Sequence, residues 1–340
     1  MRRVSKDGRL LDRPCCRPSR RAHPSPSAQE RAPQDEVRNS SRSQLKIEKR
    51  SRMTLWLTLA VNSIAFGGLL FLLSAGFSLI FGLMRIPNLM HGSFFMLGAY
   101  FGVTLMLPAV GANFWVAALA SAVAMAIIGG GVERLLLRRL AGQELAQVLL
   151  TLGLSFIVSD LCLMIWTGDP WQPLAPAEFR GVVRVGGMIF PLYRLAVVVI
   201  AVAVAAALWL MVDWTRLGAM IRAGVDDAPI ARVVGIRVSG LFTLVFALGA
   251  ALAAFAGVVG APILSVYPGL DADMLPLALI VVILGGTGSL LGALVGSFLI
   301  GFLYNFGQAR FPDLAYVILF LPMLLVLVLR PQGLFGKGGP

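Results

Sequence analysis

The residues best suited to bind a small molecule lie in two short polar interruptions of an otherwise apolar sequence. The first is GLMRIPNLMHG at residues 82–92, and the second is LGGTGS at residues 284–289. Where a helix is broken, the next half-helix begins with free backbone N–H groups and a positive dipole end, which suit a carboxylate. The residues that we assign to a substrate pathway are Asn88, His91, Gly92, Gly285, Gly286, Thr287, Gly288 and Ser289.

Both interruptions also have a simpler interpretation. Pro87 can end a helix at a membrane surface, with Arg85 reaching the lipid headgroups and His91 capping the next helix. The pair Gly285 and Gly286 can form an ordinary turn. The residues by themselves leave the pathway and the simpler interpretation equally open.

Residues that could support catalysis or hold a metal are scarce. The chain has only two histidines, and its cysteines, Cys15, Cys16 and Cys162, show neither zinc spacing nor a disulfide framework. The sequence contains no GxxxxGK[ST] phosphate loop, no HExxH and no GxSxG motif. We therefore expect no catalytic residue, no metal site and no cofactor, and a protein that is not an enzyme.

Ionisable residues within the apolar stretches are also rare, and Asp160 is the main candidate. Carriers that couple transport to protons or ions usually keep such groups at membrane depth. Without an ATP site or a strong ion-coupling site, an active transporter must receive its energy from a partner.

The composition is that of a membrane protein. Hydrophobic residues make up 58% of the chain and charged residues only 14%, whereas about a quarter of a soluble domain is charged. We expect an all-α polytopic membrane protein with about eight to nine transmembrane helices or half-helices, including broken ones. The expected segments are 55–81, 92–107, 114–131, 146–166, 192–212, 241–264, 274–284, 290–306 and 314–329.

Residues 1–52 have a different composition. They hold 15 Lys or Arg and 6 Asp or Glu, against 14 and 11 in the rest of the chain, so a net charge of +9 lies in this segment. Such a segment buries too little apolar surface to fold, which predicts a disordered basic extension. Because Met53 directly precedes the first apolar run, we expect native translation to begin there. A transmembrane domain then covers 53–335, with a short tail at 336–340.

Basic residues in short loops predict the orientation of the helices. Arginines in the loops 132–145 and 213–240 place both loops, with the C-terminal end, in the cytoplasm. The loops 167–191 and 265–273 then face outward, and the first is a long Pro-rich connection that can meet an external partner.

Two further patterns concern the loop 213–240 and the packing of the helices. In the loop 213–240, residues 226–234 form a short amphipathic stretch that Gly235 would end. Small residues at four-residue spacing permit close helix packing in lipid. We assign Gly249, Gly257, Gly292 and Gly296 to such packing.

Three stretches together resemble the permease subunits of bacterial branched-chain amino acid ABC transporters, of the LivH type. They are residues 76–100, residues 222–236 followed by 248–259, and residues 278–301, which contain LGGTGS; ERLLLRRL at 133–140 and LLTLGLSFI at 149–157 match more weakly. The sequence departs from the family at Leu89 and Met90, where Phe and Ala are usual, so the substrate stays open. Related permeases carry urea or short amides.

The resemblance implies a permease subunit of an ATP-binding cassette importer for branched-chain or similar small amino acids, in the bacterial inner membrane. The implied partners are cytoplasmic ATPase subunits, a second permease subunit, a periplasmic or extracellular substrate-binding protein and the lipid bilayer, with no nucleic acid. The residues implied in docking the ATPase are Arg222, Asp226, Asp227, Ala228, Ala231 and Gly235. The alternative is a self-contained secondary carrier or channel for a small polar solute such as urea or an amide, which would require buried ionisable residues.

Overall fold

The structure is a computed structural model, and it describes residues 34–84, 88–185, 188–226, 228–330 and 332–336. By its internal contacts the chain divides into two compact units, Met1–Arg52 and Met53–Pro340. The expected basic extension falls partly on residues 1–33, which lie outside the described residues. Helix α1 (Gln34–Met84) begins within the remainder of that segment.

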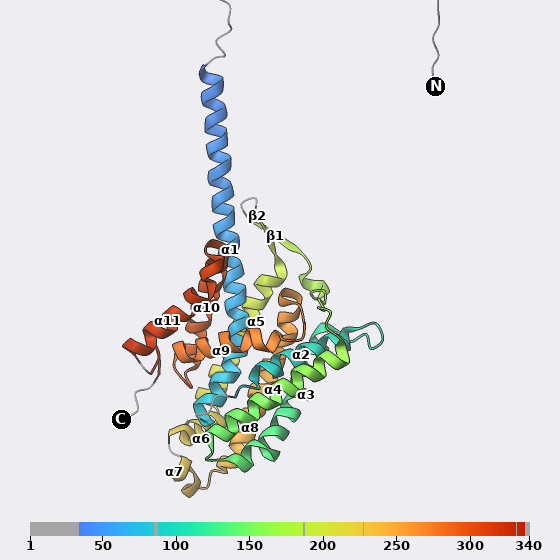
Figure 1. Ribbon diagram of the computed structural model, residues 1–340, viewed down its shortest axis with the longest axis vertical. Helices are drawn as coiled ribbons and strands as arrows, with labels where there is room; N and C mark the ends of the chain where they lie inside the picture. Colours follow the sequence, from blue (N-terminus) through green and yellow to red (C-terminus); the bar gives the residue numbers. More distant parts are fainter. Residues whose placement is uncertain (1–33, 85–87, 186–187, 227, 331, 337–340) are drawn as a thin grey trace, which may run out of the picture. The chain divides into compact units, whose positions relative to one another are not determined.

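The second unit is built of helices (Figure 1). Each of the nine expected apolar segments is part of a helix, and the prediction of an all-α polytopic membrane fold is confirmed. After α1 the helices are α2 (His91–Met106), α3 (Phe114–Leu135), α4 (Glu144–Trp166), α5 (Leu192–Trp214), α6 (Arg216–Asp226), α7 (Ala228–Val233), α8 (Val238–Leu264), α9 (Leu270–Gly285), α10 (Leu290–Arg310) and α11 (Ala315–Leu329). Short 3-10 turns cover Leu137–Leu140, Ala177–Phe179 and Pro312–Leu314.

Seven helices within the described part of the chain are long and apolar enough to cross a membrane. Helices α2 and α9 are not among them, because each has only 16 residues. At 1.5 Å per residue they extend about 24 Å, which is less than the ~30 Å of a hydrocarbon core. These two short helices adjoin the polar interruptions at residues 82–92 and 284–289.

A small hairpin departs from the expected pattern. Strands β1 (Val182–Val185) and β2 (Met188–Pro191) pair antiparallel in the segment that the sequence indicated as a loop. Its valines are β-branched, and they favour an extended chain once the hairpin pairs the backbone groups. The all-α membrane body is unchanged by this addition.

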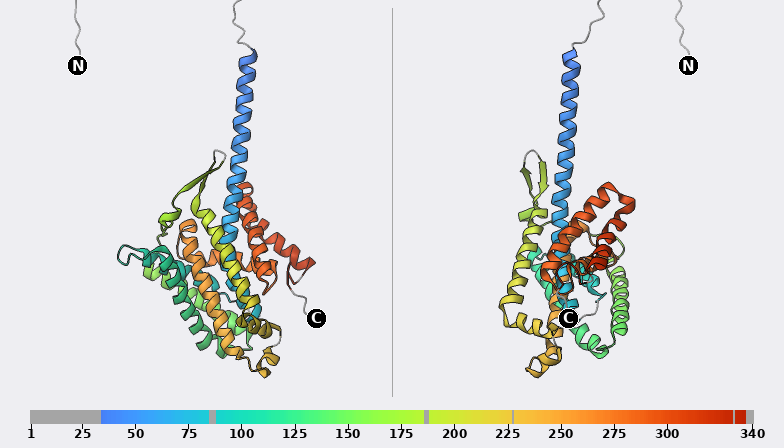
Figure 2. Two further views of the ribbon diagram at one scale, coloured as in Figure 1. Left: turned by 180° about the vertical axis from the view of Figure 1, so that it is seen from behind. Right: turned by 90° about the vertical axis from the view of Figure 1, so that its left-hand side faces the viewer.

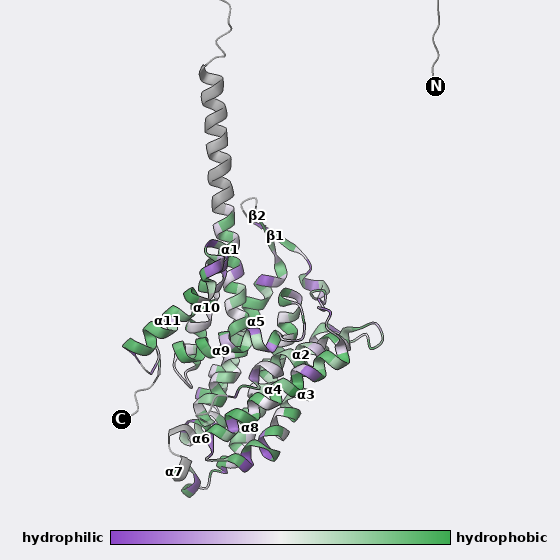
Figure 3. Cartoon of the chain, in the orientation of Figure 1, coloured by the Kyte–Doolittle hydropathy of each residue, from purple (hydrophilic) through white to green (hydrophobic). Residues whose placement is uncertain are grey.

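The loops that charge assigned to one side of the membrane also meet each other. Trp171 and Val266, from the two loops expected outside, exchange backbone hydrogen bonds of 2.8 and 2.7 Å. At the other end, Arg138 of the loop 132–145 donates to the carbonyl of Ser239, at the end of the loop 213–240. Hydrophilic residues gather near α6 and α7 and around the hairpin, whereas hydrophobic residues cover the spanning helices (Figure 3).

The spanning part of α1, Thr54–Met84, is the central helix of the second unit, and 89% of its most apolar window is buried. In both views of Figure 2 it runs among the later helices. It packs antiparallel to α8, with Gly76 against Gly249 and Leu69 against Gly260. By contrast, only 11% of the corresponding window of α4 is buried, so α4 forms an outer wall.

The four glycines assigned to helix packing all lie where helices approach closely. A methyl group on Gly257 of α8 would lie 2.1 Å from the carbonyl oxygen of Phe95 on α2. A methyl group added to Gly249 would lie 2.5 Å from Ile80 Cδ1. The same group on Gly292 would lie 2.0 Å from the carbonyl oxygen of Gly285, and on Gly296 it would lie 2.9 Å from the carbonyl oxygen of Val281. Three of these obstacles are backbone atoms, which cannot rotate away as a side chain can.

We predict that Gly257→Val lowers the free energy of unfolding by ~2 kcal/mol or more, because the new side chain forces α8 away from the α2 backbone. Thermal unfolding of the purified protein in mild detergent measures this effect. The matched control is Gly153→Val on α4, where an added methyl group meets nothing within 4 Å. Equal unfolding midpoints for the two variants would refute the close contact between α2 and α8.

Candidate functional site

Polar residues of the membrane interior gather along one line between α2 and α4. Each of the hydrogen bonds along it joins residues that are 62 positions apart, so the two helices run parallel in a single register. We call this line the α2–α4 seam. It consists of Leu89 N with Thr151 Oγ1 (3.3 Å), Ser93 Oγ with Ser155 Oγ (3.0 Å) and Trp166 Nε1 with Thr104 Oγ1 (2.7 Å).

A buried carboxylate from α9 meets the middle of the seam. Asp271 is 5% exposed, and its Oδ2 accepts hydrogen bonds from Ser93 Oγ (3.0 Å) and Ser155 Oγ (3.3 Å). Among the described residues its Oδ1 has no hydrogen-bond partner. A methyl group on Gly92 would lie 2.7 Å from the backbone oxygen of Asp271, so the start of α2 touches the start of α9.

Sequence reasoning missed Asp271 as a buried acidic residue. It placed Asp271 in an outward loop and took Asp160 as the main ionisable group of the apolar segments. In the structure Asp160 is exposed on α4, whereas Asp271 is buried in the first turn of α9. The signal was the turn Pro268–Gly269, because a Pro-Gly turn followed by acidic residues marks a helix start. Gly269 indeed takes a left-handed φ of 100° there.

Asn88 shapes the beginning of α2. Its Oδ1 accepts from Met90 N at 3.1 Å and its carbonyl accepts from His91 N at 3.1 Å. Asn88, rather than His91, therefore satisfies the first backbone donors of the helix. The side-chain Nδ2 of Asn88 is buried without a hydrogen-bond partner among the described residues, which leaves it as a free donor.

His91 is fully buried and its Nε2 lies 3.0 Å from the carbonyl oxygen of Leu73 on α1. Because a carbonyl only accepts, we assign the hydrogen to Nε2, which makes Nδ1 of the neutral ring an acceptor. The ring also packs against Phe77, with 5.2 Å between ring centroids. His91 thus fixes α2 to the middle of α1.

The second polar interruption forms a turn between α9 and α10. Gly286 and Gly288 take positive φ values of 98° and 77°, which glycine adopts readily. Ser289 caps α10, since its Oγ accepts from Gly292 N at 3.0 Å. The chain returns to this turn near its end, where Leu334 N and Phe335 N donate to the carbonyls of residues 284 and 285 at 2.9 and 3.0 Å.

The structure places Gly92 and Gly285, which the sequence assigned to one pathway, at opposite ends of α9. Gly92 touches Asp271 at the start of α9, whereas Gly285 ends that helix. Fourteen residues of helix separate these points, which corresponds to about 21 Å. Thr287 and Gly288 are exposed, while Asn88 and His91 are buried. The two interruptions nevertheless touch at Gly82, where an added methyl group would lie 2.6 Å from Gly288 Cα.

A second buried carboxylate lies at the end where α3 meets α8. Glu133 of α3 is 2% exposed, and its Oε2 accepts from Thr243 Oγ1 of α8 at 2.5 Å. Arg138 pairs with the same oxygen at 3.3 Å and also donates to Ser239 O (2.8 Å) and Thr243 Oγ1 (2.6 Å). This network joins α3 to the first turn of α8. A cavity of about 400 Å³ adjoins it and is also lined by Met84, Arg232 and Arg237.

Helix α6 is fixed to the end of α5. Arg222 Nη1 donates to the carbonyl of Val212 and pairs with Asp213 at 3.5 Å. Gly218 packs against the same carbonyl so closely that a methyl group would lie 2.0 Å from it. Arg222 therefore holds the turn between the two helices.

Helix α7 presents an apolar surface to its surroundings. Ala231 is 3% exposed and faces the rest of the second unit. By contrast, Ile230, Val233 and Val234 are 62%, 89% and 76% exposed. The helix ends where Gly235 takes a positive φ of 91°. Of the other residues assigned to docking, Asp226 ends α6 and Ala228 begins α7, and Asp227 lies outside the described residues. The exposed valines and Ile230 are the surface that sequence reasoning did not single out.

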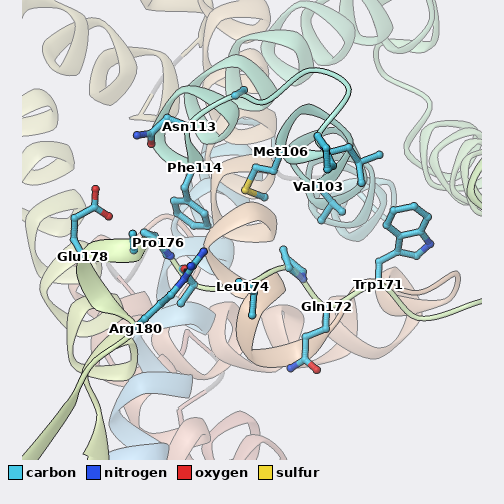
Figure 4. A pocket seen from close by; sticks show the side chains of 16 residues that line it. Val103, Met106, Asn113, Phe114, Trp171, Gln172, Leu174, Pro176, Glu178 and Arg180 are labelled. Carbon is cyan, nitrogen blue, oxygen red and sulfur yellow. The ribbon is translucent and has the colours of Figure 1, made fainter.

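An outer pocket of about 440 Å³ lies beneath the Pro-rich loop 167–191 (Figure 4). In this view Phe114 and Met106 face Arg180 and Leu174 across the pocket. Arg180 Nε donates to Ala175 O at 2.7 Å, which holds the loop in a compact turn. This loop is the one that the sequence indicated for an external contact.

Residues 59–327 match the sequence profile of a family described as "Branched-chain amino acid transport system / permease component". The chain is 28% identical over 290 residues to the high-affinity branched-chain amino acid transport system permease protein BraD of Pseudomonas aeruginosa, which covers 82% of this chain and 94% of that protein. It is 25% identical over 293 residues to the permease protein LivH of the corresponding high-affinity system of Escherichia coli K12, covering 81% and 94%.

A shorter match extends to another transport system. The chain is 29% identical over 165 residues to the autoinducer 2 import system permease protein LsrC of Yersinia pseudotuberculosis, covering 46% of this chain and 45% of that protein. No solved structure matches the chain.

We predict that Arg138→Met lowers the free energy of unfolding by ~1–3 kcal/mol, because it leaves the buried Glu133 carboxylate without its cation. The partial exposure of Arg138 places this value below that of a fully buried pair. Thermal unfolding in detergent measures the loss, with the exposed Arg139→Met as the control. The double variant Glu133→Gln/Arg138→Met is expected to recover part of the stability, and an Arg138→Met midpoint equal to wild type would contradict the network.

Proposed function

This chain belongs to the family of permease components of branched-chain amino acid transport systems, and on that premise we propose that it forms the membrane pathway for a branched-chain or similar small amino acid. The match over residues 59–327 carries the proposal, because it covers nearly the whole membrane unit. The polar seam in the interior supports it, since a zwitterion needs hydrogen-bonding groups at membrane depth.

The energy is supplied by ATPase subunits in the cytoplasm. The sequence has no phosphate loop of its own, and α7 exposes Ile230, Val233 and Val234. An exposed apolar patch at the end of a membrane protein that faces water is typical of a contact with another protein. The charge pattern places this end in the cytoplasm. We assign α6 and α7 to docking, and the complex further contains a second permease and an external binding protein in the bacterial inner membrane.

Movement of α7 has a physical route into the membrane. Helix α8 begins at Val238, close after α7, and the Glu133–Arg138–Thr243 network joins its first turns to α3. Further along, α8 packs against α2 at Gly257. A shift of α7 therefore displaces the helix whose start carries Asn88 and His91. The turn at residues 285–289 is a second position on the proposed pathway.

The direct test is uptake into proteoliposomes. The complete complex, with ATPases enclosed and loaded binding protein outside, is expected to accumulate labelled leucine only when ATP is enclosed. Valine and isoleucine serve as competitors for the binding protein. Uptake that proceeds without ATP or partners would refute the proposal and would instead indicate a self-contained carrier or channel.

We predict that Val233→Asp reduces both ATPase co-purification and ATP-driven uptake by about tenfold or more, because it places a charge in an apolar contact. Co-purification in mild detergent and uptake in proteoliposomes measure the two effects. The control is Val110→Asp, which changes another exposed valine, in the loop between α2 and α3; Val110 is 59% exposed and Val233 is 89% exposed. Normal ATPase recovery with Val233→Asp would show that α7 does not dock the ATPase.

A further inference from the structure

The carboxylate of Asp271 is held by three helices, yet it is only half satisfied. Ser93 of α2 and Ser155 of α4 both reach Oδ2 of this α9 residue. Oδ1 is buried and has no hydrogen-bond partner among the described residues. No cationic side chain in the described part of the second unit forms an ion pair with it. An uncompensated carboxylate in a membrane interior is unfavourable, and such residues mark pathways for ions or substrates.

The open positions on this carboxylate and on its two serine partners are all acceptors. The two serine hydroxyls have only two hydrogens between them, so when both donate to Oδ2 their own 3.0 Å contact carries no hydrogen and each oxygen keeps free lone pairs. Oδ1 of Asp271 provides the third acceptor position. The neighbouring Thr151 offers no competing donor, since its hydroxyl donates to Val148 O at 3.0 Å and accepts from Leu89 N.

This arrangement is complementary to a group that carries three N–H donors, a positive charge and no acceptor, which is an ammonium group. We propose that Asp271, with Ser93 and Ser155, binds the ammonium group of the transported amino acid within the membrane. The inference rests on the importer function proposed above and names the substrate contact that this function requires. One carboxylate and two hydroxyls are few ligands for Ca²⁺, which takes six to eight oxygens.

The start of α2 supplies a group for the other end of a zwitterion. Asn88 Nδ2 is a buried donor without a hydrogen-bond partner among the described residues. It precedes Ser93 by little more than one helical turn. A donor for a carboxylate therefore lies just before α2, and a set of acceptors for an ammonium group begins in its first turn.

The site around Asp271 is closed to solvent in this structure, because the residue is only 5% exposed. Its outer wall is α4, of which only 11% of the apolar window is buried against the rest of the second unit. Displacement of α4 or α9 relative to α2 opens the carboxylate. Substrate access is thus linked to helix movement, as alternating access requires.

The test compares Asp271→Asn with Asp273→Asn in the full complex in proteoliposomes, using leucine and loaded binding protein. The amide introduced by Asp271→Asn keeps an oxygen for the two serines but replaces the free acceptor by an N–H donor without charge. We expect the number of leucine molecules imported per ATP hydrolysed to fall about ten- to hundredfold. Asp273 is exposed and accepts from Tyr267 OH at 2.5 Å, so Asp273→Asn is expected to leave the ratio unchanged.

The ratio of imported leucine to hydrolysed ATP separates a loss of substrate recognition from a loss of folding, because a misfolded fraction of the protein lowers uptake and ATP hydrolysis together. If Asp271→Asn does not assemble, Ser155→Ala removes one acceptor from the outer helix and is expected to lower the same ratio by about five- to tenfold. An unchanged ratio in the variant that assembles would overturn the proposal and identify Asp271 as a permanently protonated structural acid. A wild-type complex that imports no leucine with ATP would instead refute the proposed function.

Discussion

The close contact of α8 with α1 and α2 is the constraint on which the rest of the membrane unit depends. In lipid there is no hydrophobic force between apolar helices, so their association requires packing at short range. Gly249 and Gly257 of α8 allow this approach, because any larger side chain would meet Ile80 of α1 or the carbonyl of Phe95 on α2. Around this contact the shorter helices α2 and α9 become fixed although neither reaches across the hydrocarbon core.

The polar interior follows from that fixed position of α2. His91 is fastened to the carbonyl of Leu73 on α1, and the succeeding turns of α2 present Ser93 and Thr104 to α4. Every polar group at this depth must find a partner within the protein. The hydrogen bonds along the α2–α4 seam meet this requirement for the polar groups that they join. Asp271 and Asn88 each keep a buried polar atom without a hydrogen-bond partner among the described residues, and the free oxygen of Asp271 is the feature that separates a recognition site from simple helix packing.

The α2–α4 seam and the proposed docking surface on α7 lie on the same connected set of helices. Helix α7 is exposed and apolar, α8 follows it within a few residues, and Glu133 with Arg138 binds the start of α8 to α3. Helix α8 then reaches the start of α2. Displacement applied at one end is therefore carried by packed backbones and a buried ion pair to the helices that enclose Asp271. These contacts give the transport function of the family a physical connection between α7 and the helices around Asp271.

The sequence by itself determined the helices and the family, because apolar runs of membrane length and motifs such as LGGTGS are local patterns. It also located the packing glycines by their spacing. It could not place Asp271, since the residue's two serine partners lie 178 and 116 positions away in the chain. For the same reason it treated Gly92 and Gly285 as one site, although they lie at opposite ends of α9. Helix formation depends on near neighbours, whereas burial and pairing at membrane depth depend on which helices meet, and only the tertiary structure decided that.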